Sequence, residues 1–365
     1  MINKIILSLV FSIIFFSGCI KEPDANEATL EIAIFDENMD YKIIQYDMVS
    51  SEETIYHPDT LEGANLKFSI FISEPTCMAL QINNQYTPLY LEPGYTFSID
   101  QPIVTGTSIT FSGNGAEINS LNTQFSLLLE FFNPRQYYDL ELSEFQDLVQ
   151  NIDQKADSIY AQSNQIDNSI ISFYLFKTKL MTRILSYIIS NYNLYDETVD
   201  VPEIFNNDLH SVKKYTPLIE TGAIDFSIML DFYFLTFIRP AVYKSINPKS
   251  DSIETELPRK VDDYLRNLEI ENQLKELLIA KNIYRCLKED GINDTTTDVY
   301  NRFNNSYPNS RYLPALVNKY AELMGLTAGS LTPSVLMVDP NDEVALLSET
   351  KGKLVYLDIW ATWCK

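Results

Sequence analysis

The residues best suited to chemistry are two cysteines at opposite ends of the chain, Cys19 and Cys364. Cys364 follows Trp363 and the nearly continuous apolar run Leu354–Trp360, a pattern that favours a strand buried on both faces. Where a helix begins after such a strand, its unpaired N–H groups and its dipole lower the pKa of a thiol. The resulting thiolate attacks a disulfide, and a second nearby thiol resolves the mixed disulfide. We therefore expect Cys364 to be a nucleophile, shielded on one side by Trp363.

Cys19 ends an amino-terminal segment with the features of an export signal. Lys4 supplies one positive charge, and the apolar run Ile5–Phe16 is too short to cross a bilayer core of about 30 Å. Ser17 and Gly18 then place small residues directly before the cysteine. The segment resembles a bacterial lipobox, which implies cleavage before Cys19 and diacylation of its sulfur. The alternative is an ordinary secretory signal with an incidental cysteine.

The lipid anchor sets the expected location of the protein. We expect a signal peptide over residues 1–18 and a polar tether over residues 19–27, with membrane attachment through lipid on Cys19. Two or more acyl chains anchor a protein stably. This predicts a lipoprotein of the cell envelope at the outer membrane, with the periplasmic and the surface face both left open.

The composition excludes several classes of partner and site. The chain has 50 acidic and 27 basic residues, a formal net charge of −23. A field of that sign argues against nucleic acid as a partner. The two histidines, His57 and His210, are isolated, which rules out a His-rich metal site. We expect no metal and no cofactor.

Residues 28–115 are predicted to form an antiparallel β-sandwich. Short alternating runs recur at intervals of about 8–12 residues, divided by turn residues such as Pro93-Gly94. The expected strands are Thr29–Phe35, Tyr41–Asp47, Leu66–Ile72, Met78–Ile82, Tyr86–Leu91, Tyr95–Ile99 and Ser108–Ser112.

Residues 116–326 are predicted to form a helical domain, because apolar residues there recur at spacings of three, four and seven. Ser143 and Thr297 are expected to lie at helix starts. The most apolar stretch, Phe226–Ile238, contains Asp231 and is interpreted as a buried core helix rather than a membrane span. The expected helices are Ile118–Phe132, Leu142–Gln162, Ser169–Asn191, Ile224–Tyr243, Leu257–Leu268, Glu271–Leu287, Thr297–Asn304 and Tyr312–Leu323.

Two further cysteines and two aromatic clusters have a functional and a structural interpretation. Cys77 and Cys286 could form a disulfide in an exported protein, but their spacing gives no sign of one, and we expect free buried thiols. The clusters Tyr137-Tyr138 and Phe232-Tyr233-Phe234 could stack on glycans. Core packing is the more frequent use of such clusters.

Residues 327–365 are predicted to return to strands, at Val335–Val338, Val344–Leu347 and Leu354–Trp360. The step Lys351-Gly352-Lys353, this last strand and Trp360-Ala361-Thr362-Trp363-Cys364 together resemble the thioredoxin-fold family of TlpA-like thiol-disulfide oxidoreductases. The resemblance implies that Trp363-Cys364 opens an active-site helix and that the partners are envelope proteins with disulfides or thiols. Upstream, Leu89–Gly94, Phe111–Asn119 and Tyr307–Tyr312 resemble parts of thioredoxin-like lipoproteins of Bacteroidota.

The sequence departs from this family at its last residue. The family places a second cysteine three positions after the first, here at position 367, beyond Lys365. We therefore expect an α+β multidomain protein whose thioredoxin-like segment is truncated and which is inactive by itself. Two functions stay open. The chain is the amino-terminal part of a cell-envelope thiol-disulfide oxidoreductase, or it is a non-catalytic envelope lipoprotein that binds a partner protein or a glycan. Its oligomeric state is not predicted.

Overall fold

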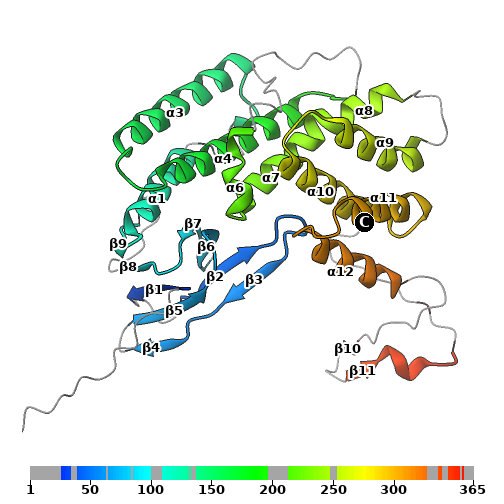
Figure 1. Cartoon of the computed structure of the whole chain (residues 1–365), viewed down its shortest axis with the longest axis horizontal. Helices are drawn as coiled ribbons and strands as arrows, with labels where there is room; N and C mark the ends of the chain where they lie inside the picture. Colours follow the sequence, from blue (N-terminus) through cyan, green and yellow to red (C-terminus); the bar gives the residue numbers. More distant parts are fainter. Residues whose placement is uncertain are drawn as a thin grey trace, which may run out of the picture. The chain divides into compact units, whose positions relative to one another are not determined.

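The structure, a computed structural model, describes residues 26–33, 39–62, 65–83, 85–99, 109–130, 132, 137–195, 213–246, 253–326, 336–338, 344–353 and 356. Antiparallel-rich sheets come first along the chain and helices follow, as predicted (Figure 1). The chain forms two compact units, each from two stretches of sequence. Unit 1 comprises residues 1–192 and 214–232, and unit 2 comprises residues 193–213 and 233–365.

Two sheets form the β part of unit 1. The strands of the first sheet, in spatial order, are β4 (Thr60–Glu62), β5 (Asn65–Phe71), β1 (Glu27–Ala33), β8 (Thr96–Ile99) and β9 (Ser112–Asn114). The strands of the second sheet are β3 (Glu53–Tyr56), β2 (Tyr41–Tyr46), β6 (Thr76–Ile82) and β7 (Gln85–Leu91).

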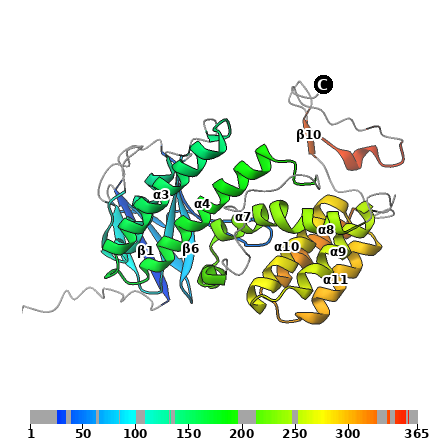
Figure 2. The same ribbon diagram turned by 90° about the horizontal axis from the view of Figure 1, so that it is seen from above.

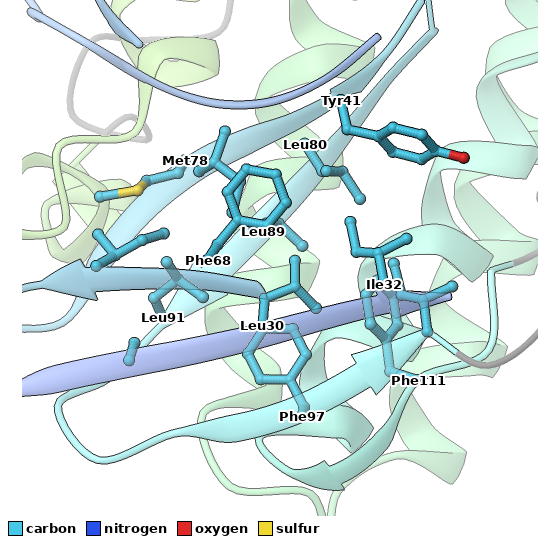
Figure 3. Close-up of a cluster of buried hydrophobic side chains, with 14 of the residues drawn as sticks. Leu30, Ile32, Tyr41, Phe68, Met78, Leu80, Leu89, Leu91, Phe97 and Phe111 are labelled. Carbon is cyan, nitrogen blue, oxygen red and sulfur yellow. The ribbon is translucent and has the colours of Figure 1, made fainter. Parts of the chain in front are cut away.

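Both sheets contribute side chains to a single apolar core (Figure 3). Leu30 and Phe68 come from the first sheet, and Leu80 and Leu89 come from the second; each is at most 1 % exposed. Inward-facing residues of the strands alternate with more exposed ones, which is the pattern that the sequence analysis used. The two facing sheets therefore bury the predicted apolar faces against each other.

One strand pairing differs from the prediction of a fully antiparallel sandwich. β1 pairs with β8 in parallel, with Leu30 opposite Phe97. Parallel neighbours need a crossover of about a dozen residues or more, and the strands from β2 to β7 lie in this connection. The first strand of the described chain thus lies inside its sheet, between β5 and β8.

Three short strands were missed or misplaced. β3 has no alternating burial, because Glu53, Thr54 and Ile55 are all exposed, so it gives no strand pattern. β4 was not predicted either. β9 lies at Ser112–Asn114 rather than at Ser108–Ser112. It pairs with β8 and contains Gly113, whose positive φ of +101° suits glycine.

Helices complete unit 1. They are α1 (Ala116–Glu130), α3 (Leu142–Gln162), α4 (Ser169–Asn191), the 3₁₀ turn η2 (Lys213–Tyr215), α6 (Pro217–Glu220) and most of α7 (Ile224–Tyr233). Phe145 of α3 stacks on Tyr187 of α4 with ring centroids 3.9 Å apart, and Tyr137 is buried beside them. The Tyr137-Tyr138 cluster therefore packs in the helical core, in line with its structural interpretation.

The predicted domain boundary at residues 115/116 does not coincide with the division between the units. α1 packs on β7, and Asn119 of α1 accepts a hydrogen bond from the Tyr90 N–H at 2.8 Å and donates one to the Tyr90 oxygen at 2.9 Å. β7 is the edge strand of its sheet, so the Asn119 amide pairs backbone groups that the sheet leaves open. These contacts place the first helices in the same unit as the sheets.

Unit 2 is built from the π-helical turn η3 (Phe234–Ile238), α8 (Arg239–Ser245), α9 (Ile253–Asn267), α10 (Asn272–Asp290), α11 (Asp294–Ser306) and α12 (Leu313–Met324), followed by β10 (Leu336–Val338), β11 (Val344–Leu346) and the 3₁₀ turn η4 (Leu347–Thr350). α9 packs on α8 and on α10 (Figure 2).

The start of α11 and the cap of α3 differ from the prediction. α11 begins before Thr297, because Asn293 caps it by accepting hydrogen bonds from the N–H groups of Thr295 and Thr296 at 2.9 and 3.0 Å. α3 begins at Leu142 with Glu141 as its N-cap rather than Ser143, and the Glu144 carboxylate accepts from the Glu141 N–H at 3.4 Å.

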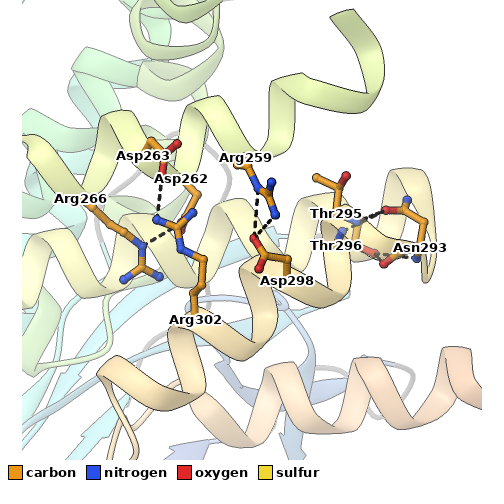
Figure 4. Close-up of polar contacts among 9 residues, drawn as sticks. All are labelled: Arg259, Asp262, Asp263, Arg266, Asn293, Thr295, Thr296, Asp298 and Arg302. Carbon is orange, nitrogen blue, oxygen red and sulfur yellow. Dashed lines mark hydrogen bonds and ion pairs between the residues drawn. The ribbon is translucent and has the colours of Figure 1, made fainter. Parts of the chain in front are cut away.

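Buried and exposed ion pairs join α9 to α11 (Figure 4). Asp262 is fully buried and pairs with Arg266 at 2.8 Å and with Arg302 at 3.0 Å. Arg302 also reaches Asp263 at 2.7 Å. Burial raises the pKa of Asp262, and the two guanidinium groups oppose that rise.

One helical stretch of the described chain, Ile224–Ser245, is long and apolar enough to cross a membrane by length and composition. Its most apolar window has a mean hydropathy of 1.2 and is 56 % buried within the protein. Phe226, Met229 and Leu230 are fully buried. This burial favours the predicted core helix, since a core helix passes the same test of composition.

Candidate functional site

The site residues expected from the sequence lie outside the described residues. This holds for the nucleophile Cys364, for Trp363 and for the lipidation site Cys19, as well as for His210. His57 is an exposed loop residue. The structure therefore gives no contacts or distances for the chemistry expected at Cys19 and Cys364. Only the segment that leads to Cys364 is partly described.

That leading segment is a hairpin followed by a turn. β10 and β11 pair in antiparallel register, with Val338 opposite Val344. The side chains of Leu336, Val338 and Val344 are 56–61 % exposed, so the hairpin presents apolar surface. Gly352 follows η4 with a φ of +85°, a conformation that glycine adopts without strain. Of the predicted strand Leu354–Trp360, only Tyr356 is described, and it is 90 % exposed.

Both described cysteines are free and buried, as predicted. Burial raises the pKa of Cys77 to about 12, and that of Cys286 also to about 12. The Cys77 thiol lies 3.4 Å from the Thr221 hydroxyl oxygen, which opposes the rise. At neutral pH both groups are therefore protonated thiols, which are poor nucleophiles.

A cavity lies among the helices of unit 2. Its volume is about 300 Å³. η3 and α8 contribute one side chain each, α9 contributes an apolar wall and α10 contributes a polar face. The lining residues are Phe234, Arg239, Leu257, Pro258, Val261, Asn282, Arg285, Cys286, Glu289 and Asp290. This volume lies at the small end of the range of ligand sites, about 300–1,000 Å³.

A π-helical turn brings two of these residues to the cavity together. The Arg239 N–H donates to the Phe234 carbonyl, five residues back, in the turn that directly precedes Pro240. In a regular α-helix, positions five apart are rotated by about 140° and face different ways. The extra residue in this turn allows Phe234 and Arg239 to line the same cavity.

Charges of both signs surround the cavity. The Arg285 guanidinium lies over the Phe234 ring, 4.0 Å from its centroid. Arg239 Nη1 lies 3.9 Å from Glu289 Oε2. Asp290 and Glu289 raise the pKa of the Cys286 thiol beyond the effect of burial, whereas Arg285 and Arg239 lower it. All four charges therefore act on the same thiol, and the lining carries no net charge.

Asn282 supplies the unusual polar group of this cavity. Its side chain is 2 % exposed, and its Nδ2 has no hydrogen-bond partner. Its Oδ1 lies 3.9 Å from the Cys286 sulfur, a weak contact. A buried amide N–H without an acceptor costs about 1–3 kcal/mol. The Nδ2 atom is itself buried, so this cost belongs to the packing of α10 and not to the open space of the cavity.

The cavity does not suggest a metal site. Among the described residues, no group of three or more His, Cys, Asp or Glu side chains is placed to hold an ion. The guanidinium groups of Arg239 and Arg285 lie among the carboxylates of the lining, and their positive charge disfavours a cation there.

Comparison of the chain with family models, with curated proteins and with solved structures gives no match. We therefore infer function from the residues of the chain alone.

The sequence pattern did not predict the cavity. Asn282 lies among the buried apolar positions Leu278, Ile279 and Ile283 of α10. The helical spacing of these apolar residues could have identified Asn282 as a polar residue on a buried helix face. The π-helical turn had only Pro240 as its signal, and the convergence of α8, α9 and α10 depends on packing.

Proposed function

We propose that this chain is part of a cell-envelope thiol-disulfide oxidoreductase in which Cys364 is the attacking thiolate. The observation that carries the proposal is the motif Trp360-Ala361-Thr362-Trp363-Cys364, which resembles the TlpA-like active site. The β10–β11 hairpin and the Gly352 turn precede it in the order that this resemblance expects. The exposed apolar residues of the hairpin support it, since a thioredoxin-like domain buries such strands.

The proposed chemistry is thiol-disulfide exchange. The Cys364 thiolate attacks one sulfur of a partner's disulfide, the other sulfur leaves as a thiolate, and a mixed disulfide forms. A second thiolate then attacks the Cys364 sulfur and releases the partner. Cys77 and Cys286 are unsuited to this second step, because both are buried and have a pKa of about 12. The resolving thiol must therefore come from an external thiol or from a further segment of a longer chain.

Trapping of the mixed disulfide tests this proposal. A chain that starts at Ile20, so that Cys19 contributes no thiol, is mixed with a disulfide-containing peptide and analysed by mass spectrometry. We expect one adduct per chain, on Cys364, and none in the Cys364→Ser variant. Cys77→Ser and Cys286→Ser are the controls and keep the adduct. Absence of an adduct on Cys364 would contradict the proposal.

Turnover is a separate measurement on the same chain. We expect no acceleration of disulfide reduction, since no described thiol can resolve the intermediate. Clear catalytic turnover by this chain would show that the expected inactivity is wrong.

The second candidate is a non-catalytic envelope lipoprotein that binds a ligand. The cavity of unit 2 favours it, because its volume of about 300 Å³ is large enough for a small molecule and its lining combines charged and apolar side chains. A saturable ligand together with an unreactive Cys364 would favour this candidate over the oxidoreductase.

A further inference from the structure

One arginine of unit 1 lacks the acidic partner that other arginines of the chain have. Ion pairs with carboxylates are made by Arg239, Arg259, Arg266 and Arg302. Arg183 of α4 makes no ion pair or hydrogen bond with another residue that the structure describes, and its side chain is partly exposed. In a chain with a net charge of −23, such a guanidinium is a place where an anion can bind.

Three hydroxyl groups gather on the same side of α4. Ser186 and Ser190 follow Arg183 by three and seven residues, and these spacings share one face of a helix. The Tyr138 hydroxyl oxygen lies 2.5 Å from Ser186 Oγ. Tyr138 and Ser186 are partly exposed and Ser190 is exposed, so a ligand can reach this surface.

The segment that carries Tyr138 is held on α4. The Asn191 amide donates to the Tyr138 carbonyl at 3.4 Å, and the Tyr187 hydroxyl donates to the Leu140 carbonyl at 3.0 Å. The Tyr138 ring also packs against the ring of Tyr137, with centroids 4.4 Å apart. These contacts position the phenol before a ligand arrives, so binding loses little side-chain entropy.

The Tyr138 phenol is a better hydrogen-bond donor than an ordinary tyrosine. Burial raises its pKa, but hydrogen bonds, led by that with Ser186, and the charge of Arg183 together lower its pKa below the ordinary 10.0. A serine hydroxyl that donates to the phenol oxygen leaves the phenol proton free to donate to a ligand. Such a donor makes a strong hydrogen bond when its acceptor is ionised.

The charges around Arg183 favour a ligand with a single negative charge. Arg183 supplies one positive charge. Asp139 and Glu141 follow Tyr138 closely in the chain, but both are exposed and neither pairs with Arg183. A second negative charge on the ligand would add to the repulsion from these carboxylates and from the net charge of the chain.

The direction of α4 places the ligand along this surface. α4 ends at Asn191, and the carboxyl end of a helix disfavours an anion, so the ligand should lie toward Arg183 rather than toward Ser190. There the guanidinium offers two parallel N–H groups and the Tyr138 hydroxyl offers a third donor. This set suits the oxygens of a carboxylate or of a sulfate ester.

We propose that Arg183 and the Tyr138 hydroxyl bind a singly charged oxyanion, a carboxylate or a sulfate ester. The guanidinium pairs with two oxygens of the ligand, and the phenol donates to one of its oxygens. The site lies in unit 1 and does not involve Cys364. The Cys364→Ser variant therefore retains it, and its failure would leave the proposed thiol-disulfide exchange untouched.

Arginine-selective labelling of the full chain tests the proposal. The chain is treated with phenylglyoxal at an ionic strength held constant with chloride, and the labelled arginines are mapped by mass spectrometry. Acetate and methyl sulfate are the two probes. We expect at least one of them to protect Arg183 saturably, while the exposed Arg259, whose partner is Asp298, keeps its labelling rate. The probe that protects at the lower concentration identifies the class of anion.

The Tyr138→Phe variant tests the second donor. It removes the phenol hydroxyl and keeps the ring that packs against Tyr137. Half-protection of Arg183 should need about ten times more probe, as expected for the loss of one hydrogen bond to a charged group. Tyr174→Phe is the matched control, because Tyr174 lies nine residues before Arg183 on α4, and it should behave like the natural chain.

Three outcomes would overturn the proposal. They are no saturable protection of Arg183 by either probe, equal protection by chloride, and an unchanged probe requirement in a folded Tyr138→Phe variant. Far-UV circular dichroism establishes that both variants are folded, and the protection of the natural chain does not depend on either variant.

Discussion

Three asparagines buried in helices, Asn119, Asn122 and Asn282, show how differently one residue type is used. Asn119 is fully buried and makes hydrogen bonds to Tyr90 and to Gly115. The amide of Asn122, one turn later on α1, makes none, and that of Asn282 has an unpartnered Nδ2. The cost of replacing each residue should therefore follow its partners rather than its burial.

Replacing Asn119 should be costly. The Asn119→Ala substitution leaves the Tyr90 N–H and carbonyl of an edge strand without partners, and we expect a loss of about 2–4 kcal/mol in the free energy of unfolding. Urea denaturation measures it. Asn122→Ala is the control. A loss as large for Asn122 as for Asn119 would show that cavity formation, and not hydrogen bonding, dominates at both positions.

Asp262 should contribute a pH-dependent part of the stability. Asp262→Asn replaces the buried carboxyl group that faces Arg266 and Arg302 by a neutral amide of the same size, so the difference in stability between the two forms follows the ionisation of Asp262. Because burial raises its pKa above the ordinary 3.8, folded Asp262 keeps its proton to higher pH than unfolded Asp262 does. Its contribution to stability is therefore greatest below pH 3.8 and declines as the pH rises through the folded pKa.

Urea denaturation of both forms across that pH range checks the sign. The margin of the natural chain over Asp262→Asn should narrow as the pH rises. A margin that widens would mean that the ion pairs with Arg266 and Arg302, and not burial, control this carboxyl group.

Among the elements, those with a continuous apolar face were predictable. α3 and α4 have the bounds that their periodicity predicts, because each buries one apolar stripe. β3 was not predictable, since its side chains are exposed and pairing with β2 holds it. The parallel pairing of β1 with β8 and the cavity of unit 2 both depend on contacts between distant segments, which local patterns do not encode.

The pairing of β9 with β8 depends on a glycine within β9. In Gly113→Ala the new Cβ would lie 2.5 Å from the Thr96 oxygen at a φ of +101°, and we expect a loss of about 3 kcal/mol in the free energy of unfolding. Gly94 has a φ of +83° but open space around it, so Gly94→Ala should cost only about 1 kcal/mol of backbone strain. Equal losses in urea denaturation would rule out the close approach to Thr96 as the cause.

At the scale of the whole molecule, each unit contains one buried free thiol among the residues that the structure describes, Cys77 in unit 1 and Cys286 in unit 2. Native Cys77 and Cys286 should resist alkylation at neutral pH, because each has a pKa of about 12, and both should react once the chain unfolds. Peptide mapping after a labelling pulse therefore reports the unfolding of each unit separately. Rapid labelling of either thiol in the native chain would contradict its burial.

Two matched substitutions test whether the units unfold independently. Leu80→Ala removes a fully buried side chain from unit 1, and Leu277→Ala removes one from unit 2; each should cost about 3 kcal/mol in its own unit. In urea, Leu80→Ala should shift the labelling midpoint of Cys77 more than that of Cys286, and Leu277→Ala should do the reverse. Equal shifts of both midpoints would show a single cooperative transition.

Unit 1 is built from two stretches of the chain, so its sheets are synthesised before the segment that completes it. The Cys77 N–H donates to the Thr221 carbonyl at 2.7 Å, and the Cys77 thiol meets the Thr221 hydroxyl, a residue 144 positions later in the chain. The Ser227 hydroxyl donates to the Met48 carbonyl across a still longer separation. At a synthesis rate of about 5–20 residues per second, the sheet residues are made roughly 10–30 s before these partners. During that interval the nascent chain exposes apolar surface that these later residues cover in the folded unit. Chaperone binding to the chain is most favoured during this interval.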